Sequence, residues 1–352
     1  PAVDADIGDP RGIIWLPNGD LIVSESNGQR VRRIDLAAGI TTGFAGTGFA
    51  GFSGDGGPAT EANLTGPRGL AADASGRTFL IDYFNEAVRL IDNGIISTIA
   101  GDPLDFYSFR DGVPATESSL ANPSGVAVDG DGNVYIAESS GHRIRKVDTT
   151  GLISTFAGDG AAGSTGDGGP AGLARLNAPQ DVVYGPSGRL YVSDSGNHKI
   201  RVIDLSSGVI QTVAGSGQRG STGNQGDALS FSLNEPGGLA VAPDGSVLIA
   251  DAQNDRVLRL TVQFQDATVP TEPPPVDPGG GGTGTADFNG DGSVDFLDFL
   301  PFAEAFGTSN PAFDLDGNGM VGFSDFLNFS NAFGRPISSN PAYRSHPTGV
   351  RR

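Results

Sequence analysis

The sequence predicts an all-β fold, a β-propeller of four-stranded blades, followed by a small α-helical pair of metal-binding loops. Two internal repeats predict this organisation. A unit of four short apolar runs occurs five times, at steps of 57, 56, 56 and 57 residues, and begins at Pro10, Pro67, Pro123, Pro179 and Pro236. An acidic unit occurs twice, at Asp287 and Asp314, with a period of 27 residues. A long fixed period with a four-strand unit is typical of small sheets arranged around an axis.

The third copy shows the unit most clearly, in residues 123–158, PSGVAVDGDGNVYIAESSGHRIRKVDTTGLISTFAG. Its runs VAV, VYIAE, RIRKV and ISTFA are rich in β-branched and aromatic residues and are too short for helices. The segments DGDGN, SSGH and TTG separate them, so we expect a four-stranded antiparallel meander. Such a sheet cannot bury both of its faces alone, so each sheet needs a neighbour on either side.

Two columns of charged residues run through the copies. The second run ends in an acid every time, at Glu25, Asp82, Glu138, Asp194 and Asp251. The third run carries Arg32, Arg89, Arg145 and Arg201, and then departs at Leu258. Five equivalent acids argue against a catalytic ring, because a catalytic site breaks symmetry. We expect each acid to pair with the arginine of its own blade or to accept hydrogen bonds from turn amides.

These residues resemble the NHL-repeat family of propellers. The resemblance rests on the pattern Pro-x-Gly-apolar-Ala, followed by GNVYIAE and HRIRKVD, as in residues 132–148. The inserts FSGDGGPATEANL (52–64) and STGDGGPAGLARL (164–176) are similar to the long bacterial form of the repeat. The resemblance covers roughly residues 1–264 and implies a propeller there.

Composition excludes several classes of function. The formal net charge is −19, so the surface repels phosphates and we expect no nucleic-acid partner. No apolar run approaches the ~20 residues of a membrane-spanning helix. The chain has no cysteine, so neither disulfides nor thiolate metal sites are available.

Four segments follow from this organisation: a propeller at 1–264, a Pro/Gly-rich linker at 265–286, a calcium module at 287–334 and an unstructured tail at 335–352. The fifth repeat stops after its third predicted strand. Residues 1–10 match 58–67, an inter-blade insert, so we expect an N-terminally incomplete propeller. Five repeats are present, and five or six blades are expected in the intact ring.

The acidic units have the spacing of twelve-residue calcium loops. Positions 1, 3, 5, 7, 9 and 12 of the first loop are Asp287, Asn289, Asp291, Ser293, Asp295 and Asp298. The second loop has Asp314, Asp316, Asn318, Met320 and Asp325, with Gly322 at position 9. Ca²⁺ takes six to eight hard oxygens, and position 7 supplies a backbone carbonyl, so Met320 also serves. We expect two Ca²⁺ ions as cofactors.

Position 12 is Asp rather than Glu, and no helix precedes the first loop. Both features resemble dockerin modules of type I, which pair two loop–helix halves in the manner of EF-hands. The resemblance implies a cohesin-like or cell-surface protein as partner, and the alternative is a calcium-stabilised anchor. Because such loops suit the calcium outside cells, we expect a secreted, extracellular or cell-surface protein of bacterial type.

Asymmetric residues are the better candidates for a ligand face on the propeller. The residue after the opening proline differs between copies: Arg11, Arg68, Ser124, Gln180 and Gly237. Asp181 replaces a glycine of the other copies, and the loop DPLDFYSFRDG (102–112) carries Phe106, Tyr107 and Phe109. These aromatics either grip a polysaccharide or protein, or cover a neighbouring blade. His142 and His198 share one column, which does not make a zinc site, and the turn at 129–133 imitates a calcium loop but aligns with hairpins.

Three functions remain open. The first is an exported binding or scaffold protein, with a propeller that presents an interaction face and a module that anchors it. The second is an extracellular enzyme of lactonase, hydrolase or lyase type, with its site on the propeller axis. The third is a structural subunit of a surface layer or filament. No Ser-His-Asp set, phosphate loop or dinucleotide motif is visible, so we expect binding rather than catalysis.

Overall fold

A computed structural model describes residues 2–105, 107–223 and 225–261, together with 309, 311, 313–315 and 321. The chain divides into two compact units, Pro1–Gln263 and Phe264–Arg352. The predicted linker, loop helices and tail lie outside the described residues, and so do all predicted calcium ligands except Asp314. Within the described part, no helix has the length and apolar character needed to cross a membrane.

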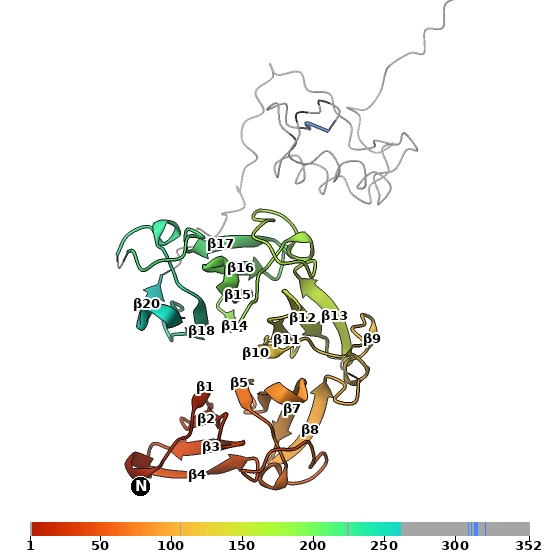
Figure 1. Ribbon diagram of the computed structural model, residues 1–352, viewed down its shortest axis with the longest axis vertical. Helices are drawn as coiled ribbons and strands as arrows, with labels where there is room; N and C mark the ends of the chain where they lie inside the picture. Colours follow the sequence, from red (N-terminus) through yellow and green to blue (C-terminus); the bar gives the residue numbers. More distant parts are fainter. Residues whose placement is uncertain are drawn as a thin grey trace, which may run out of the picture. The chain divides into compact units, whose positions relative to one another are not determined.

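The first unit is a β-propeller of five blades (Figure 1). The first two blades contain β1 (Pro10–Trp15), β2 (Leu21–Glu25), β3 (Arg30–Asp35), β4 (Ile40–Ala45), and β5 (Pro67–Ala72), β6 (Thr78–Asp82), β7 (Ala87–Asp92), β8 (Ile95–Ala100). The third and fourth contain β10 (Pro123–Val128), β11 (Val134–Glu138), β12 (Arg143–Val147), β13 (Leu152–Ala157), and β14 (Asp181–Gly185), β15 (Arg189–Asp194), β16 (Lys199–Asp204), β17 (Ile210–Ala214). The fifth contains β18 (Pro236–Val241), β19 (Val247–Asp251) and β20 (Arg256–Leu260). Strands pair antiparallel in chain order, which confirms the predicted meander.

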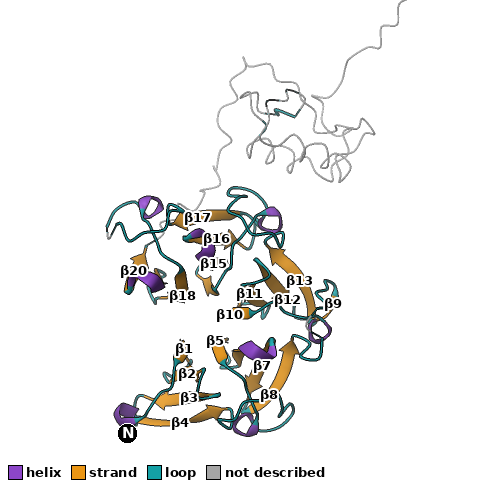
Figure 2. Ribbon diagram, in the orientation of Figure 1, coloured by secondary structure: helices purple, strands orange, loops and turns teal. Residues whose placement is uncertain are grey.

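Only short 3₁₀ turns interrupt the strands in the described residues (Figure 2). They are η1 (Ala2–Asp4), η2 (Ala59–Glu61), η3 (Tyr83–Asn85), η4 (Ala115–Glu117), η5 (Ala171–Leu173), η6 (Ser195–Asn197), η7 (Ala228–Ser230) and η8 (Ala252–Asn254). The turns η3, η6 and η8 join the second and third strands of their blades, and η2, η4, η5 and η7 lie in the long inserts between blades. The turns therefore punctuate an all-β unit.

The outer edge of the third blade carries a strand that the sequence pattern did not predict. The two-residue β9 (Val113–Pro114) pairs antiparallel with β13 and comes from the insert that precedes the blade. Single bridges occupy the same place in other blades, between Pro58 and Ile95 and between Pro170 and Val209. The long inserts before the second, third and fourth blades are thus each fastened to the outermost strand of the blade that follows.

Hydrophobic cores lie between successive blades. Ile22 and Val31 of the first blade pack against Leu70 and Leu80 of the second. Equivalent clusters join the second blade to the third and the third to the fourth. Full burial of one such side chain stabilises the fold by about 1.5–3 kcal/mol. The repeated unit therefore folds against its neighbours, as its period predicts.

The innermost strands β1, β5, β10, β14 and β18 follow one another around the axis (Figure 1). In β1, β5 and β10 the backbone approaches the next blade closely because a glycine stands two residues after the opening proline. A Cβ on Gly69 would stand 2.6 Å from the carbonyl oxygen of Ser124 in the next blade, too close for any side chain. This close approach explains the recurrence of glycine at Gly12, Gly69 and Gly125.

Among the described residues, one sheet face of the first blade and one sheet face of the fifth blade are left uncovered. Ile13 is 64% exposed, whereas its equivalents Leu70, Val126, Val182 and Leu239 are 8%, 2%, 0% and 9% exposed. Val257 is 69% exposed, whereas Val31, Val88, Ile144 and Ile200 are all fully buried. In the described residues, β1 and β18 do not pack together as the other neighbouring inner strands do. In the described residues the sheet of the fifth blade has three strands, β18, β19 and β20.

Candidate functional site

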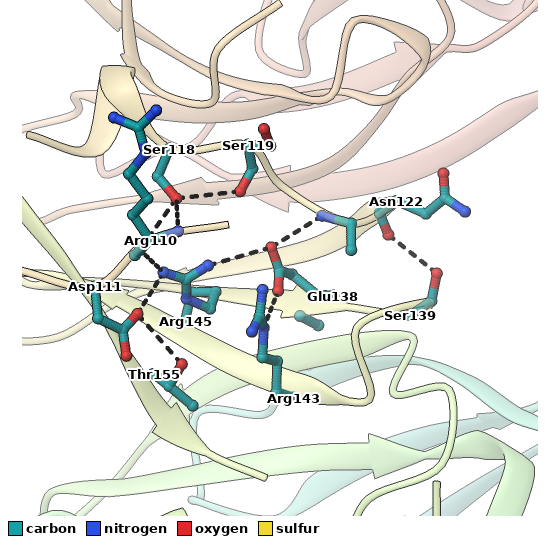
Figure 3. A network of polar contacts seen from close by, with 12 residues as sticks. Arg110, Asp111, Ser118, Ser119, Asn122, Glu138, Ser139, Arg143, Arg145 and Thr155 are labelled. Atoms are coloured by element: carbon teal, nitrogen blue, oxygen red, sulfur yellow. Dashed lines mark hydrogen bonds and ion pairs between the residues drawn. The ribbon is translucent and has the colours of Figure 1, made fainter. Parts of the chain in front are cut away.

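The repeated acids and arginines form a structural network, shown for the third blade in Figure 3. Glu138 is fully buried at the end of β11, and its Oε1 accepts a hydrogen bond from the Ala121 amide at 2.9 Å. Arg143 donates to the other carboxylate oxygen. Arg145 lies 3.8 Å from Glu138 and binds Asp111 of the preceding insert at 2.7 Å. One buried arginine therefore links the strand to the insert.

Other blades repeat this arrangement. Arg89 lies 3.2 Å from Asp82 and 2.6 Å from the insert residue Asp55. Arg201 connects its blade in the same way, through the carboxylates of Asp194 and Asp167. Burial raises the pKa of Asp82 and Asp194 above the ordinary aspartate value, although amide and arginine contacts offset part of the rise. The prediction that these acids pair with arginines is confirmed, and it accounts for the acids without catalysis.

In the fifth blade, a nearby arginine makes the contacts that the repeated arginine makes in the other blades. Leu258 stands where the other blades have arginine, and Arg256 lies two residues earlier. Arg256 Nε lies 2.7 Å from Asp251 and its guanidinium also donates to carbonyls of the preceding insert, including Gly223 at 3.1 Å. The link between acid and insert is therefore retained although its sequence position shifts.

The two histidines fasten neighbouring blades together. His142 Nδ1 accepts the Ala178 amide at 3.0 Å, and His198 Nδ1 accepts the Glu235 amide at 3.2 Å. Gln29 plays the same part in the first blade, through the Gly66 amide at 2.7 Å. Among the described residues, no three His, Cys, Asp or Glu side chains gather as a metal cluster. The histidine column is an inter-blade contact.

The turn at residues 129–133 is a hairpin, as its alignment predicts. Asp129 Oδ1 accepts the amides of Asp131 at 3.0 Å and Asn133 at 2.9 Å. Asp129 Oδ2 accepts the Tyr135 hydroxyl at 3.0 Å. Burial raises the pKa of Asp129, but the hydrogen bonds from Asn133 and Tyr135 outweigh it and leave the pKa below its ordinary value. The carboxylate is fully used in closing the turn.

The asymmetric residues of the inner strands surround one end of the axis, which we call the mouth: Arg11, Arg68, Ser124, Gln180, Asp181 and Gly237. The guanidinium carbon of Arg68 lies 3.3 Å from the ring centre of Tyr83, with the exposed ring of Phe84 at 6.0 Å. Arg68 Nε is buried and finds no hydrogen-bond acceptor among the described residues. Arg11 is exposed and pairs with Asp9 at 3.1 Å. The mouth thus presents a cation stacked on aromatic rings.

Asp181 is held deep in the mouth by backbone amides. Its Oδ1 accepts a hydrogen bond from the backbone amide of its neighbour Val182 at 2.9 Å. Its Oδ2 accepts one from the backbone amide of Leu239, in the next blade, at 2.8 Å. A Cβ on Gly125 would collide with this carboxylate, so glycine in the adjoining blade makes room for it. Burial raises the pKa of Asp181 to about 7, against the opposing effect of the two amides. The side chain therefore bridges two blades and titrates near neutrality.

The structure separates the aromatic loop from the mouth. The segment 102–112 leads directly into β9, which lies at the outer edge of its blade, four strands away from β10. Tyr107 is exposed, and Phe109 is partly exposed beneath Arg143, whose guanidinium carbon is 5.5 Å from the ring centre. Phe106 lies outside the described residues. The predicted ligand face is thus two places, one axial and one at the rim.

Sequence reasoning missed the pair Tyr83 and Phe84 in the mouth. The same turn holds Ser26 and Asn27, Ser139 and Ser140, Ser195 and Gly196, and Ala252 and Gln253 in the other blades. An aromatic pair at one of five equivalent turns was a visible signal, since it breaks the repeat as Asp181 does.

Five small sheets around an axis define the class of this unit as a β-propeller, and comparisons with known proteins give the family. The family described as the teneurin NHL domain matches residues 18–105 and 101–165, and the NHL repeat matches residues 176–203. The propeller is therefore of the NHL-repeat family, and it is similar to the NHL domain of teneurins. The predicted NHL resemblance is confirmed.

Relatives share this region and are much longer proteins. Teneurin-1 of Mus musculus is 30% identical over 224 residues, which cover 57% of this chain and 8% of that protein. Teneurin-4 of Homo sapiens is 30% identical over 282 residues, 68% of this chain and 10% of that protein. Protein SUPPRESSOR OF QUENCHING 1, chloroplastic, of Arabidopsis thaliana is 30% identical over 213 residues, which cover 57% of this chain and 20% of that protein. The chain thus spans a fifth or less of the length of these relatives.

Solved structures show the same fold at low sequence identity. Two are described as auxiliary nutrient binding proteins, from Bacteroides thetaiotaomicron and Bacteroides ovatus. The first has a TM-score of 0.51 at 18% identity and covers 70% of this chain and 58% of its own. The second has a TM-score of 0.53 at 19% identity and covers 72% and 59%. This likeness concerns the fold.

Proposed function

We propose that this chain is an exported binding or scaffold protein, whose propeller presents its mouth to a polysaccharide or cell-surface protein. One observation carries the proposal. The residues that fasten strands, inserts and blades repeat around the ring, whereas the residues of the mouth differ from blade to blade. A repeated frame with a varied mouth suits recognition, because the frame fixes positions and the mouth supplies specificity.

The chemistry of the mouth supports a partner with both polar and apolar surface. Arg68, stacked on Tyr83 beside exposed Phe84, offers a cation and ring faces together. Rings of this kind bury large area at low entropic cost, and arginine and tyrosine are frequent in binding hot spots. The net charge of −19 disfavours a nucleic-acid partner.

The second part of the proposal is that a dockerin-like calcium module anchors the propeller or docks it to a cohesin-like partner. The donor set of the loops at Asp287 and Asp314 supports it, since alternate oxygen-bearing residues around a glycine suit Ca²⁺. Such calcium sites favour export to the extracellular space or the cell surface. The Pro/Gly composition of residues 265–286 suits a tether between the two parts.

An array of plant and bacterial polysaccharides, probed with the labelled full chain, tests the mouth. We expect binding to at least one polysaccharide, weakened about tenfold or more by the double substitution Arg68→Ala and Gln180→Ala. Arg175→Ala is the matched control, because Arg175 is an exposed arginine paired with Asp159 on an insert. Equal loss in the control and the mouth variant would contradict a role for the mouth.

Asp181 favours a second candidate, an extracellular enzyme with acid–base chemistry on the axis. A carboxyl with a pKa near 7 at the mouth can donate or accept a proton at ordinary pH. Against it, both oxygens already accept backbone amides. Turnover of a lactone or glycan by the wild type, abolished in Asp181→Asn, would establish the enzyme in place of the scaffold.

A further inference from the structure

A cavity of about 420 Å³ lies between hairpins at the other end of the inner strands. The mouth is at the first residues of β5, β10 and β14, whereas the cavity is at their last residues, roughly 15 Å further along each strand. Its lining comes from three blades: Ala72, Asp73, Ala74, Ser75 and Arg77, then Val128, Asp129, Gly130, Asp131 and Gly132, and finally Tyr184. A cavity of this size fits a small ligand.

Arg77 supplies hydrogen-bond donors to the cavity. Its Nε binds Asp73 Oδ2 at 2.6 Å, which fixes the guanidinium across the hairpin. One terminal nitrogen lies 4.0 Å from the point where a Cβ on Gly132 would stand, so the side chain reaches the neighbouring hairpin. No described residue accepts a hydrogen bond from the two terminal nitrogens. An anchored arginine with free donors is prepared to bind ligand oxygens.

Asp131 and Tyr184 supply an acceptor and a ring. Asp131 is exposed at the tip of its hairpin, and its carboxylate has no hydrogen-bond or ion-pair partner among the described residues. The hydroxyl of Tyr184 lies 3.6 Å from the Cβ position of Gly130, so the phenol spans from the fourth blade to the third. Val128 and Ala72 give the cavity an apolar floor.

The charges of the lining select the ligand. Asp73 offsets the charge of Arg77, and Asp129 is engaged in its turn, so the free carboxylate of Asp131 leaves a net negative site. A carboxylate or phosphate ligand is repelled by this net negative charge, and a cationic ligand is repelled by the guanidinium of Arg77. Neutral hydroxyl groups both accept from Arg77 and donate to Asp131, and the C–H face of a pyranose packs on a tyrosine ring.

We propose that this cavity is a binding site for a neutral sugar of one or two pyranose rings. The site is distinct from the mouth and goes beyond the proposed function, because it names a ligand class at separate residues. Each of its three polar groups comes from a different blade, so the ring arrangement itself assembles the site.

Ligand-observed NMR and calorimetric titration of the full chain test the site. The probes are methyl glucoside, methyl galactoside, methyl mannoside, maltose and cellobiose, with glucuronate and glucosamine as charged comparators. We expect saturable binding of at least one neutral probe, weakened about tenfold by Arg77→Ala and by Asp131→Ala. Tyr184→Phe keeps the ring packing and loses only the hydroxyl, so its effect is smaller.

The repeat provides matched controls. Arg189 and Asp244 hold the hairpin positions of Arg77 and Asp131 in other blades and do not line the cavity. Arg189→Ala and Asp244→Ala should leave sugar binding unchanged. Absence of binding by every neutral probe, preference for a charged comparator, or equal losses in the control variants would overturn the proposal. Thermal melts of each variant separate lost binding from lost folding.

Discussion

Asp181 shows how one residue alters a repeated frame. The other blades have Gly12, Gly69, Gly125 and Gly238 at this position. The carboxylate fits because glycine in the third blade leaves space, and it joins its own strand to the next blade through the Leu239 amide. Its enclosure by backbone raises its pKa although the residue keeps partial exposure at the mouth.

The elevated pKa predicts a pH-dependent stability. The folded-state pKa of about 7 lies above the ordinary value of 3.8, so folding favours the protonated acid. The resulting stability is fully present below pH 3.8 and is lost as pH rises through 7. As the pH rises from 5 to 8, we expect the unfolding free energy of Asp181→Asn to increase relative to that of the wild type. The increase should be on the order of 2 kcal/mol, after allowance for solvent screening. Urea denaturation at several pH values measures this.

The control for that experiment is Asp244→Asn, because Asp244 is an exposed carboxylate whose pKa is held below its ordinary value by hydrogen bonds from Ser246 and by Arg259. A difference between Asp181→Asn and wild type that stays constant from pH 5 to 8 would show that burial of Asp181 does not favour its protonated form.

At the scale of the element, each blade depends on a strand acid, a buried arginine and an insert. Arg89, Arg145 and Arg201 are all but fully buried, with one carboxylate on the strand and one on the insert. Removal of one partner from such a pair leaves an uncompensated buried charge, which costs several kcal/mol. The network therefore explains why the long inserts follow the outer edges of the blades.

Packing between blades predicts a contrast within one column of the repeat. Val88 is fully buried between two blades, and Val257 is its exposed equivalent in the fifth. We expect Val88→Ala to lower the unfolding free energy by about 2 kcal/mol, because it removes two methyl groups and leaves a cavity. Val257→Ala should change it by less than about 0.5 kcal/mol. Chemical denaturation compares the two, and equal losses would contradict the inter-blade packing described above.

Periodicity made the blades predictable, and asymmetry limited the prediction of the site. Strand order, the acid–arginine pairs and the hairpin at 129–133 follow from residues that recur in register. Strand β9 was missed because two residues of an insert carry no pattern of their own. The cavity beside Arg77 and Tyr184 was missed because its residues are far apart in the sequence and meet only when three blades close on the axis. No residue that recurs in the repeat indicates that these side chains come together.

At the scale of the whole molecule, the propeller and the C-terminal unit are separate compact parts. We expect Asp287→Ala with Asp314→Ala to abolish calcium binding and to leave the melting of the propeller unchanged, because the proposed loops would fold only around bound Ca²⁺. Calorimetry of the full chain, with and without Ca²⁺, measures both effects. Wild type and double variant with the same calcium affinity would refute the proposed loops.

The two bare faces at Ile13 and Val257 also belong to this scale. Exposed apolar sheet faces and strand edges promote association. Light scattering across a concentration series therefore tests the third function, a subunit of a surface layer or filament. Particles that grow with concentration in the wild type, but not in Val257→Glu, would support this function.

The most direct test of a binding propeller is the fate of a captured ligand. The polysaccharide retained by the full chain is eluted after prolonged incubation, and its mass is compared with that of the starting material. We expect an unchanged polysaccharide, and retention that depends on Arg68 and Gln180. A shortened or ring-opened product that disappears with Asp181→Asn would contradict the scaffold and identify an enzyme.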